Sequence, residues 1–566
     1  MTNRRNSNKL PWSAGGGGVY GPSRGGSARS LALGAIVLGV LAVLVFVFMR
    51  ACMGGGCNYS YCSSDRDLAA PEGFERVSKV FEYNNAKGPV AEGSQVLVSI
   101  DLTKDSAGAN LSMFRYVDET KTWEPLAGAE TDASGKVATA TLNEAPAVIA
   151  VLRRLSPAGN VVAYLPKGET LHEAAAGKIT LLHPLDFTPS ADGGIAGEAT
   201  VLQGDPKFDV YPAVSASAAN QADAIVASIL ATPESRSNHV QQIAAKVRES
   251  NLKGIEIAYL DLKPDQRTSF ALFIAELSGV LRKENRKVTV MLPPPLWAND
   301  RIDEGAYDWR AIGTAVDLIE MAPFRDQSRY RLDMPRILDY VTSAVDRQKL
   351  VLTVTPYATE KASDGTITPM SITQAMAIAT KLSISGVDSK LTTDSNVDVV
   401  GVNIDRRENL YGLTWDPNTA TVAFSYKFNT NRTVWLENFF SVGFKLEYIS
   451  EYRLGGVAVE DASANKYLGN IWTAITPYVS SGQPVLMQPH PNDLVPSWEV
   501  SGGQEEGGER AGQNGVLRWF TPSEPGTYVV KLLLSDGVAQ FESQISVNIL
   551  PRERTPAAGA SPTPAQ

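Results

Sequence analysis

The chain opens with a polar, glycine-rich stretch, which is followed by one uninterrupted apolar run. The run covers residues 31–49, LALGAIVLGVLAVLVFVFM, and contains no charged residue. At about 1.5 Å per residue, a helix of this length spans roughly 28 Å, enough to cross the hydrocarbon core of a bilayer. Residues 1–30 have too little apolar surface to offset the entropy of ordering and predict a disordered tail. We therefore expect a transmembrane helix over 31–49 and a flexible linker over 50–70.

Charges on the two sides of this run predict its orientation. Five arginine or lysine residues and no acidic residue precede it, whereas Asp65, Asp67 and Glu72 follow it. Because positive residues favour the cytoplasmic side, we expect a single-pass protein of the cell membrane with a cytoplasmic N-terminus and an extracytoplasmic bulk. A cleaved signal peptide is the alternative, but the run is long and the flank Met-Arg-Ala-Cys-Met has no A-x-A cleavage site.

Short alternating segments begin near residue 72. Gln95–Ile100 and Lys136–Leu142 alternate apolar and polar positions and are bounded by turn residues, a pattern typical of strands in a small sandwich. LSMFRYVDETKTWEPL (111–126) is similar to strands of immunoglobulin-like modules. We expect a β-sandwich over 71–155 and a β-rich connector over 156–205.

The pattern changes near residue 206, where strands begin to alternate with helices. Alternation of this kind predicts a parallel sheet whose strands are linked by helices, here a (β/α)8 TIM barrel over 206–482. A β-rich stretch over about 386–430 interrupts it and is expected to form an inserted lobe. Two helices are predicted by apolar residues at the spacing of a buried face: Val240, Ile243, Ala244 and Val247, then Phe270, Ile274, Leu277 and Leu281. The expected strands include a first one at 208–214, and others at 287–293, 315–323, 349–356 and 455–460.

The C-terminal part returns to a β pattern over 483–550. PSEPGTYVVKLLLSDG (522–537) resembles the end of PKD-type immunoglobulin-like domains, with apolar positions alternating toward a core. Residues 551–566 form a Pro/Ala-rich tail that we expect to be disordered. The predicted fold class is therefore multidomain, with an α/β barrel between two all-β, immunoglobulin-like sandwiches.

Charge and composition exclude several kinds of partner. A net charge of −9 argues against nucleic acid, which needs a clustered basic face. All three cysteines, Cys52, Cys57 and Cys62, precede the folded regions, and either a Cys57–Cys62 disulfide or free thiols fit this spacing. We expect no cofactor. We also expect no metal site, because the four histidines are far apart in sequence: His172, His183, His239 and His490.

Residues 254–261, GIEIAYLD, resemble the strand-four motif of glycoside hydrolase family 18, in which three acids alternate as Asp-x-Asp-x-Glu. The resemblance continues in order through 250–295, 304–324 and 432–460, and it is closest to the branch that cleaves peptidoglycan in spores and cell walls. It implies a TIM barrel that acts on glycans containing N-acetylglucosamine.

The three motif positions hold Glu256, Ala258 and Leu260. Because successive residues of a strand point to opposite faces, these three share the face that points into a barrel. In the family, the last Glu protonates the leaving oxygen and the middle Asp orients the substrate's own acetamide, which attacks the anomeric carbon. The resemblance therefore places a leucine at the position of the proton donor and an alanine at the orienting position.

Other candidate site residues lie near the predicted strand ends. The family's Tyr-Asp pair falls on Phe324 and Arg325, and its Trp falls on Glu460, which we include among the substrate-binding candidates. Asp261 follows the lost Glu, and a β-bulge could turn this displaced acid into the cavity. Sugar rings stack on aromatic faces, and three residues are candidate platforms: Tyr211, Trp297 and Tyr357.

These observations lead to one main hypothesis and two alternatives. The main hypothesis is a membrane-anchored, extracytoplasmic family 18-like protein that is catalytically inactive and binds cell-wall or other N-acetylglucosamine-containing glycan, or a surface protein. The first alternative is an active chitinase-like or glucosaminidase-like glycosidase that uses Asp261 as its acid. The second is a structural protein of the cell surface, since barrels host many functions.

Overall fold

The computed structural model describes residues 61–553, apart from 72, 85–94, 107–109, 143, 156–157, 203, 205, 218, 220, 385–389, 405–411, 465–469 and 506–514. The chain divides into two units, Met1–Ser63 and Ser64–Gln566, and β1 (Tyr61–Ser64) spans the division. The account that follows concerns the second unit.

The predicted transmembrane run at 31–49 lies outside the described residues, as do both predicted tails. In the part of the chain that the structure describes, no helix is long and apolar enough to cross a membrane. Cys62 is disulfide-bonded, while Cys52 and Cys57 lie outside the described residues.

The first part of the second unit, residues 64–155, is named here the N-terminal β-rich region. Its strands lie in the order β3-β8-β5-β6-β7-β4, with β2 beside β8. The predicted strands at 95–100 and 136–142 are confirmed as β4 and β7, which pair antiparallel with Val98 opposite Ala140. The strands are β2 (Phe74–Arg76), β3 (Val80–Tyr83), β4 (Val96–Asp101), β5 (Leu111–Val117), β6 (Thr122–Thr131), β7 (Val137–Leu142) and β8 (Val148–Arg154).

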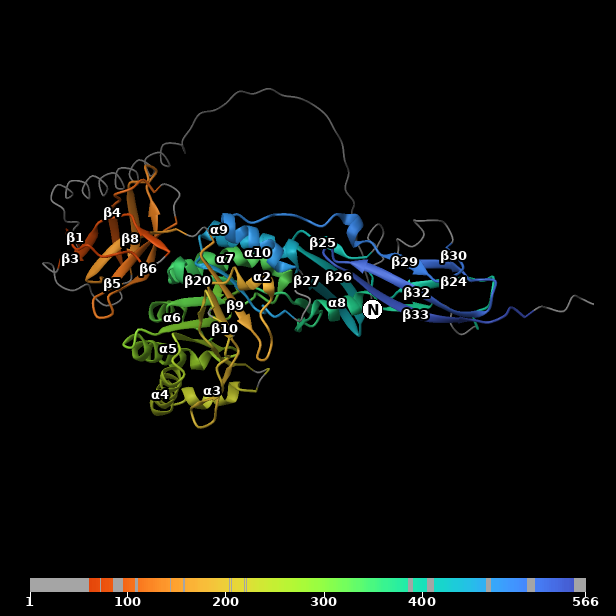
Figure 1. Cartoon of the computed structure of the whole chain (residues 1–566), viewed down its shortest axis with the longest axis horizontal. Helices are drawn as coiled ribbons and strands as arrows, with labels where there is room; N and C mark the ends of the chain where they lie inside the picture. Colours follow the sequence, from red (N-terminus) through yellow and green to blue (C-terminus); the bar gives the residue numbers. More distant parts are fainter. Residues whose placement is uncertain are drawn as a thin grey trace, which may run out of the picture. The chain divides into compact units, whose positions relative to one another are not determined.

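Eight parallel strand positions form a closed, TIM-barrel-like ring (Figure 1). β28 pairs with β9, Val457 opposite Val161, which closes it. The third position is shared by β13, which pairs with β10, and β14, which pairs with β15. Pro212, which has no N–H to donate, lies at the break between them. In ring order the strands are β9 (Asn160–Leu165), β10 (Leu181–Pro184), β13 (Asp209–Val210) with β14 (Ala213–Ala216), β15 (Gly254–Tyr259), β16 (Lys287–Leu292), β19 (Leu318–Met321), β20 (Leu350–Val354) and β28 (Gly456–Val459).

The ring therefore starts earlier than the sequence analysis places it. Residues 208–214 contribute to the third strand position and not to the first. The expected connector over 156–205 supplies β9 and β10, and also two short strands of the same sheet, β11 (Phe187–Pro189) and β12 (Ile195–Gly197). The connection between β9 and β10 contains a helix of only four residues, α2 (Glu173–Ala176). Because that connection lacks a long amphipathic helix, the alternation that identifies a barrel begins only after β14.

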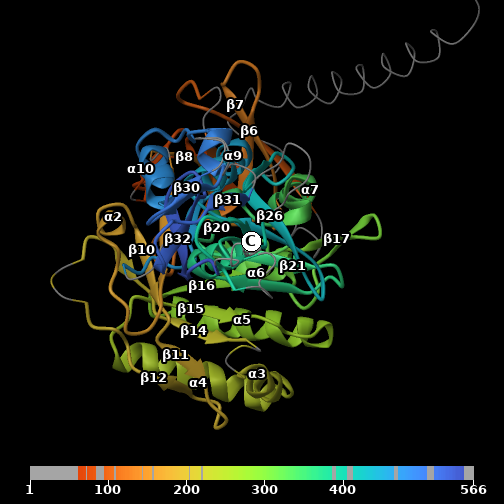
Figure 2. The same ribbon diagram turned by 90° about the vertical axis from the view of Figure 1, so that its right-hand side faces the viewer.

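Helices pack against the outer face of the ring. The predicted stripes on α4 and α5 are confirmed, since all eight residues are buried. α4 begins at a capping box, in which Thr232 accepts a hydrogen bond from the Ser235 amide and Pro233 takes the first helical position. Figure 2 shows α4 and α5 lying along β14, β15 and β16. The helices are α3 (Asp223–Leu230), α4 (Pro233–Glu249), α5 (Arg267–Arg282), α6 (Trp309–Ala315), α7 (Tyr330–Ala344), α9 (Phe439–Tyr452) and α10 (Ile471–Ser481).

A lobe is inserted between β20 and α9, as predicted, but it is larger than expected. Its sheet has the order β22-β21-β27-β26-β25 and begins at Ala358. Ile372 and Met376 of α8 are fully buried in the core of this lobe together with Val422 of β26. The elements are β21 (Ala358–Ala362), β22 (Ile367–Met370), α8 (Ile372–Ala379), β25 (Thr414–Asp416), β26 (Thr421–Phe428) and β27 (Thr430–Leu436).

The C-terminal β-rich region contains two sheets, β23-β24-β31-β30 and β29-β32-β33. Two of its strands come from the inserted segment: β24 pairs antiparallel with β31, and Val399 and Leu517 are both fully buried in its core. The predicted strand at 522–537 is confirmed as β32. The strands are β23 (Leu382–Ile384), β24 (Asn396–Gly401), β29 (Ser497–Val500), β30 (Gln504–Glu505), β31 (Val516–Phe520), β32 (Gly526–Ser535) and β33 (Gln540–Ile549).

Candidate functional site

β15 presents alternate side chains to the two sides of the barrel wall, as predicted. Ile257 and Tyr259 belong to the buried layer between strands and helices. Ala258 and Leu260 instead pack with side chains from the other strands inside the ring. Glu256 is 0% exposed and also lies inside, where the Tyr164 hydroxyl donates to its Oε1 over 3.1 Å. The inward face of β15 therefore presents the isobutyl group of Leu260 beside the methyl group of Ala258.

Asp261 is exposed and lies just after β15. Its backbone is left-handed, with φ +61°, which ends the strand at this point. Burial raises the pKa of Tyr307, and the negative charge of Asp261 adds to that effect. Tyr307 belongs to the outer layer, where its hydroxyl donates to the Tyr259 carbonyl over 3.0 Å. Asp261 thus lies exposed beyond the end of β15, while Leu260 faces the interior.

Opposite charges meet at the barrel mouth, the end of the ring where the strands have their carboxyl ends. Arg325, after β19, forms an ion pair with Glu460, after β28, and its Nη1 lies 3.2 Å from Glu460 Oε2. Beside it Phe324 is buried, its ring 6.0 Å from that of Tyr330. The charges of Arg325 and Glu460 are therefore complementary to each other at this end of the ring.

Tyr357 is the predicted aromatic residue that the structure places at the mouth. It follows β20, it is half-buried, and its hydroxyl donates to Asp461, after β28. Asp461 is almost fully buried and also accepts a hydrogen bond from the Ser463 amide over 2.9 Å. Tyr357 and Glu460 are thus brought to the same end of the ring.

The other two predicted platforms are Tyr211 and Trp297. Tyr211 was expected at a strand end, but it lies near the beginning of the third strand position, 9% exposed, with its hydroxyl 3.3 Å from Asp209 Oδ2. The sequence predicts a strand that ends at residue 214, whereas the third strand position continues to Ala216, so Tyr211 lies well before its end. Trp297 lies on the hairpin of β17 (Leu296–Ala298) and β18 (Arg301–Asp303), where the guanidinium of Arg336 stacks 5.0 Å from its ring centre.

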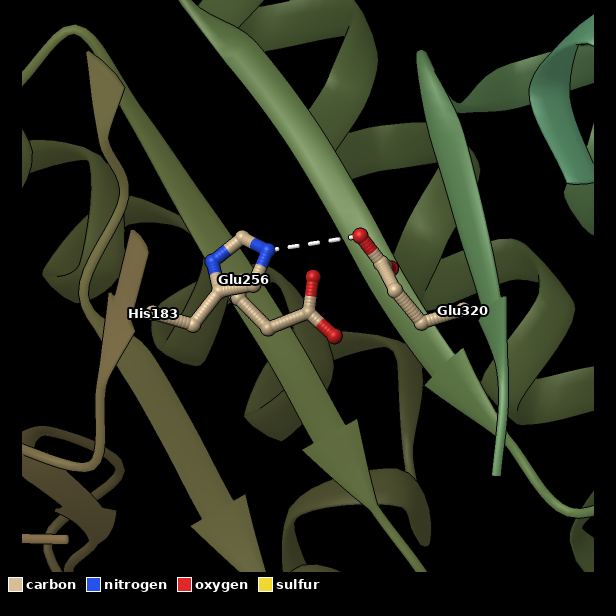
Figure 3. A group of neighbouring side chains, drawn as sticks. All are labelled: His183, Glu256 and Glu320. Carbon is tan, nitrogen blue, oxygen red and sulfur yellow. Dashed lines mark hydrogen bonds and ion pairs between the residues drawn. The ribbon is translucent and has the colours of Figure 1, made fainter. Parts of the chain in front are cut away.

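A polar cluster that the sequence analysis missed lies deeper in the ring. His183 of β10, Glu256 of β15 and Glu320 of β19 are each 0% exposed, and Figure 3 shows their side chains pointing toward one another from three strands. His183 Nε2 lies 3.3 Å from Glu320 Oε1. The Thr289 hydroxyl and the Tyr164 hydroxyl donate to the two oxygens of Glu256.

Burial determines the protonation of this cluster. It raises the pKa of Glu320 to about 8, raises the pKa of Glu256 well above its ordinary value, and lowers the pKa of His183. Without a bound cation, Glu320 is therefore protonated at neutral pH and donates to a neutral imidazole. The contact between His183 and Glu320 is then a hydrogen bond between neutral groups.

Comparisons with known proteins identify proteins that are similar to parts of this chain. Human di-N-acetylchitobiase is 23% identical over 188 residues, which cover 31% of this chain and 48% of the human protein. The chain thus spans about half the length of the curated relative it matches.

Two similar solved structures are bacterial. A chitinase from Chromobacterium violaceum has a TM-score of 0.42 and 19% identity, over 57% of this chain and 99% of the other. The spore cortex-lytic enzyme SleL of Bacillus megaterium has a TM-score of 0.41 and 15% identity, over 61% of this chain and 79% of the other.

The match to a family model covers most of the ring and all of the inserted lobe. Residues 205–464 match the model described as "Glycosyl hydrolases family 18". The matched residues begin after β9 and β10. The chain therefore contains a glycoside hydrolase family 18 domain over residues 205–464.

Proposed function

We propose that this chain is a non-hydrolytic family 18 protein that binds glycan containing N-acetylglucosamine, such as cell-wall glycan, at its barrel mouth. The observation that carries the proposal is Leu260, which packs inside the ring where the family's proton donor belongs. General acid catalysis typically contributes about 10²- to 10⁴-fold to the rate, and a leucine contributes none of it. Ala258, 5% exposed beside it, has no group to orient an acetamide.

Polar groups at the mouth support a binding role. Barrels bind ligands at the C-terminal ends of their strands, and here Arg325, Glu460, Tyr357 and Asp461 supply hydrogen-bond donors and acceptors at that end. The name of the human relative, di-N-acetylchitobiase, supports N-acetylglucosamine as the sugar. The apolar run at 31–49 supports a membrane anchor, with the barrel outside the cell.

Binding of chitotetraose to the full chain tests the proposal, when it is measured together with the products after long incubation. We expect saturable binding and recovery of intact tetrasaccharide. Arg325→Ala should weaken binding by about tenfold or more, because a charge-assisted hydrogen bond contributes on the order of 1.5–3 kcal/mol. Arg518→Ala is the matched control, since Arg518 pairs with Asp398 in the C-terminal β-rich region, 3.9 Å apart.

A structural role is the second candidate, and one observation favours it. The domain is joined to both β-rich regions by specific contacts: β24 pairs with β31, Arg282 forms an ion pair with Glu124 (3.2 Å), and Arg347 forms one with Glu130 (2.9 Å). Contacts of this kind would allow the domain to serve as a spacer between the two β-rich regions. Absence of glycan binding in the chitotetraose experiment would favour this role over the glycan-binding one.

A further inference from the structure

The cluster inside the ring has the composition of a metal site. His183, Glu256 and Glu320 each offer one ligand atom, and these three atoms lie within 4.8 Å of one another. The ligand atoms of a tetrahedral zinc site lie roughly 3.3 Å apart, given bonds of about 2.0–2.1 Å. The distance between His183 Nε2 and Glu320 Oε1 is already 3.3 Å. The ligand atom of Glu256 lies within 4.8 Å of the other two and would have to move closer for all three to reach that spacing.

His183 is oriented as metal-binding histidines are. Its Nδ1 lies 2.7 Å from the carbonyl oxygen of Tyr211. Because a carbonyl oxygen only accepts hydrogen bonds, Nδ1 carries the proton and Nε2 presents its lone pair to the two carboxyl groups (Figure 3). A hydrogen bond from the second ring nitrogen to a backbone carbonyl is the usual way in which a metal-binding histidine is fixed.

Glu320 supplies an independent indication of a ligand. Its Oε2 is buried, and among the described residues the carboxyl group of Glu256 is the one side chain that can share a proton with it, although the residue is 0% exposed. Among the described residues, no lysine or arginine forms an ion pair with Glu256 or Glu320. Two carboxyl groups buried side by side without a basic partner must hold protons to stay neutral, and a cation between these side chains would replace those protons.

We propose that His183, Glu256 and Glu320 bind one divalent transition-metal ion, with zinc as the preferred ion. An imidazole nitrogen beside carboxylates favours zinc and its neighbours over magnesium and calcium, which prefer oxygen ligands alone. The Tyr164 hydroxyl, 3.1 Å from Glu256 Oε1, is a further oxygen donor beside the cluster. Since all three ligands are fully buried, the ion would be structural and would join β10, β15 and β19 from inside the ring. The site lies deeper than the mouth and does not depend on glycan binding there.

The experiment measures the metal content of the full chain. The protein is produced without a polyhistidine tag in medium with added zinc, purified without chelators, and analysed by plasma mass spectrometry. We expect about one zinc per chain, which EDTA removes only after the chain is unfolded, because the ligands are enclosed. His183→Gln and Glu320→Gln should each lower the zinc content at least tenfold.

His239→Gln is the matched control. His239 is also 0% exposed and also faces a backbone carbonyl through Nδ1, 2.7 Å from Gly193 O, but its Nε2 lies 2.6 Å from the Tyr259 hydroxyl. This variant should keep its zinc. Zinc that persists in both His183→Gln and Glu320→Gln would overturn the proposal as an adventitious ion only.

A second measurement does not depend on the variants. The wild-type chain is refolded with cobalt(II), whose visible absorption reports inner-sphere ligands. An absorption band that saturates at about one equivalent supports the site. A refolded protein with no band and no bound zinc would contradict the site and would leave a cluster of neutral, hydrogen-bonded side chains in the ring.

Discussion

Leu260 and Ala258 limit what the inside of this barrel can do. Both side chains pack in the interior cluster, and neither can donate or accept a proton. The nearest acid in sequence, Asp261, is exposed and acts electrostatically on Tyr307 of the outer layer. The chemistry of the site therefore depends on which side chain occupies each inward position of β15, and not on the presence of acids nearby in the sequence.

Restoring the acids should destabilise the fold without restoring activity. Leu260→Glu with Ala258→Asp would place two like charges about 6–7 Å apart on one face of β15. We expect a loss of a few kcal/mol in the free energy of unfolding at neutral pH, because unpaired buried charges must be desolvated or neutralised. Thermal melts and assays with a fluorogenic chitobioside check both points.

The neutral pair Leu260→Gln with Ala258→Asn is the control for side-chain shape. It should destabilise less than the acidic pair at neutral pH, and the two should converge as the pH falls and the carboxylates become protonated. Unchanged stability together with recovered hydrolysis would show instead that the active-site frame of an enzyme is intact.

At the level of single residues, the sequence predicted the face to which a side chain points better than it predicted the residues around that side chain. The inward positions of Glu256, Ala258 and Leu260 followed from the two-residue period of a strand, and the structure confirms them. The partners of Glu256 were not predictable, because His183 and Glu320 lie on strands that are distant in sequence and adjacent only in the closed ring. The expectation of no metal site rested on spacing along the chain, which does not measure distance inside a barrel.

Among the structural elements, prediction succeeded where apolar residues recur at helical spacing over a long segment. α4 and α5, each with four predicted apolar positions that are all buried, were recognised, whereas β9 and β10 were not, because α2 between them is only one turn long. The pairing of β24 with β31 was also not predictable. It joins residues more than a hundred positions apart, and no local pattern specifies a partner strand.

One short element, the 3₁₀ turn Arg347–Lys349, lies where the N-terminal β-rich region meets the barrel. Lys349 is buried there beside a cavity of about 100 Å³, and its Nζ donates to the Gly313 carbonyl over 3.0 Å. Burial lowers the pKa of Lys349 to about 8, because a charged amine is poorly solvated in this position.

This shift predicts a pH dependence of stability. The unfolded chain binds more protons at Lys349 than the folded chain does between about pH 8 and pH 10.5, so this residue destabilises the fold most below pH 8. Lys349→Met should therefore raise the free energy of unfolding by up to about 3 kcal/mol at pH 7, and the gain should shrink toward pH 10.5. Denaturant titrations from pH 7 to 10 measure the difference. Lys531→Met, at a partly exposed site on β32, should change little. A gain that does not vary with pH would contradict the lowered pKa of Lys349 as its cause.

In the whole molecule, the N-terminal β-rich region contacts the end of the barrel opposite the mouth. Glu130 forms ion pairs with Arg347, just before β20, and with Arg453, just before β28, and Arg154 donates to the Leu454 carbonyl over 3.0 Å. These barrel residues precede the strands, whereas Arg325, Glu460 and Tyr357 follow them. The mouth therefore lies at the end of the ring that this region does not contact.

If the apolar run at 31–49 anchors the chain as proposed, protease added to intact cells should remove everything that follows it. The reason is the charge asymmetry, with five cationic and no acidic residues before the run. Immunodetection of the C-terminal region before and after lysis measures accessibility. Protection until lysis would contradict the orientation, and release of the chain by carbonate wash alone would contradict the anchor.

The most direct test of the account is turnover of chitin oligosaccharides and peptidoglycan glycan strands by the purified chain, compared with its Asp261→Asn variant. We expect no turnover above background for either protein, because Leu260 and Ala258 occupy the positions that the resemblance gives to the proton donor and to the group that orients the acetamide. Steady turnover by the wild-type chain that is abolished in Asp261→Asn would contradict it and would identify Asp261 as a displaced catalytic acid.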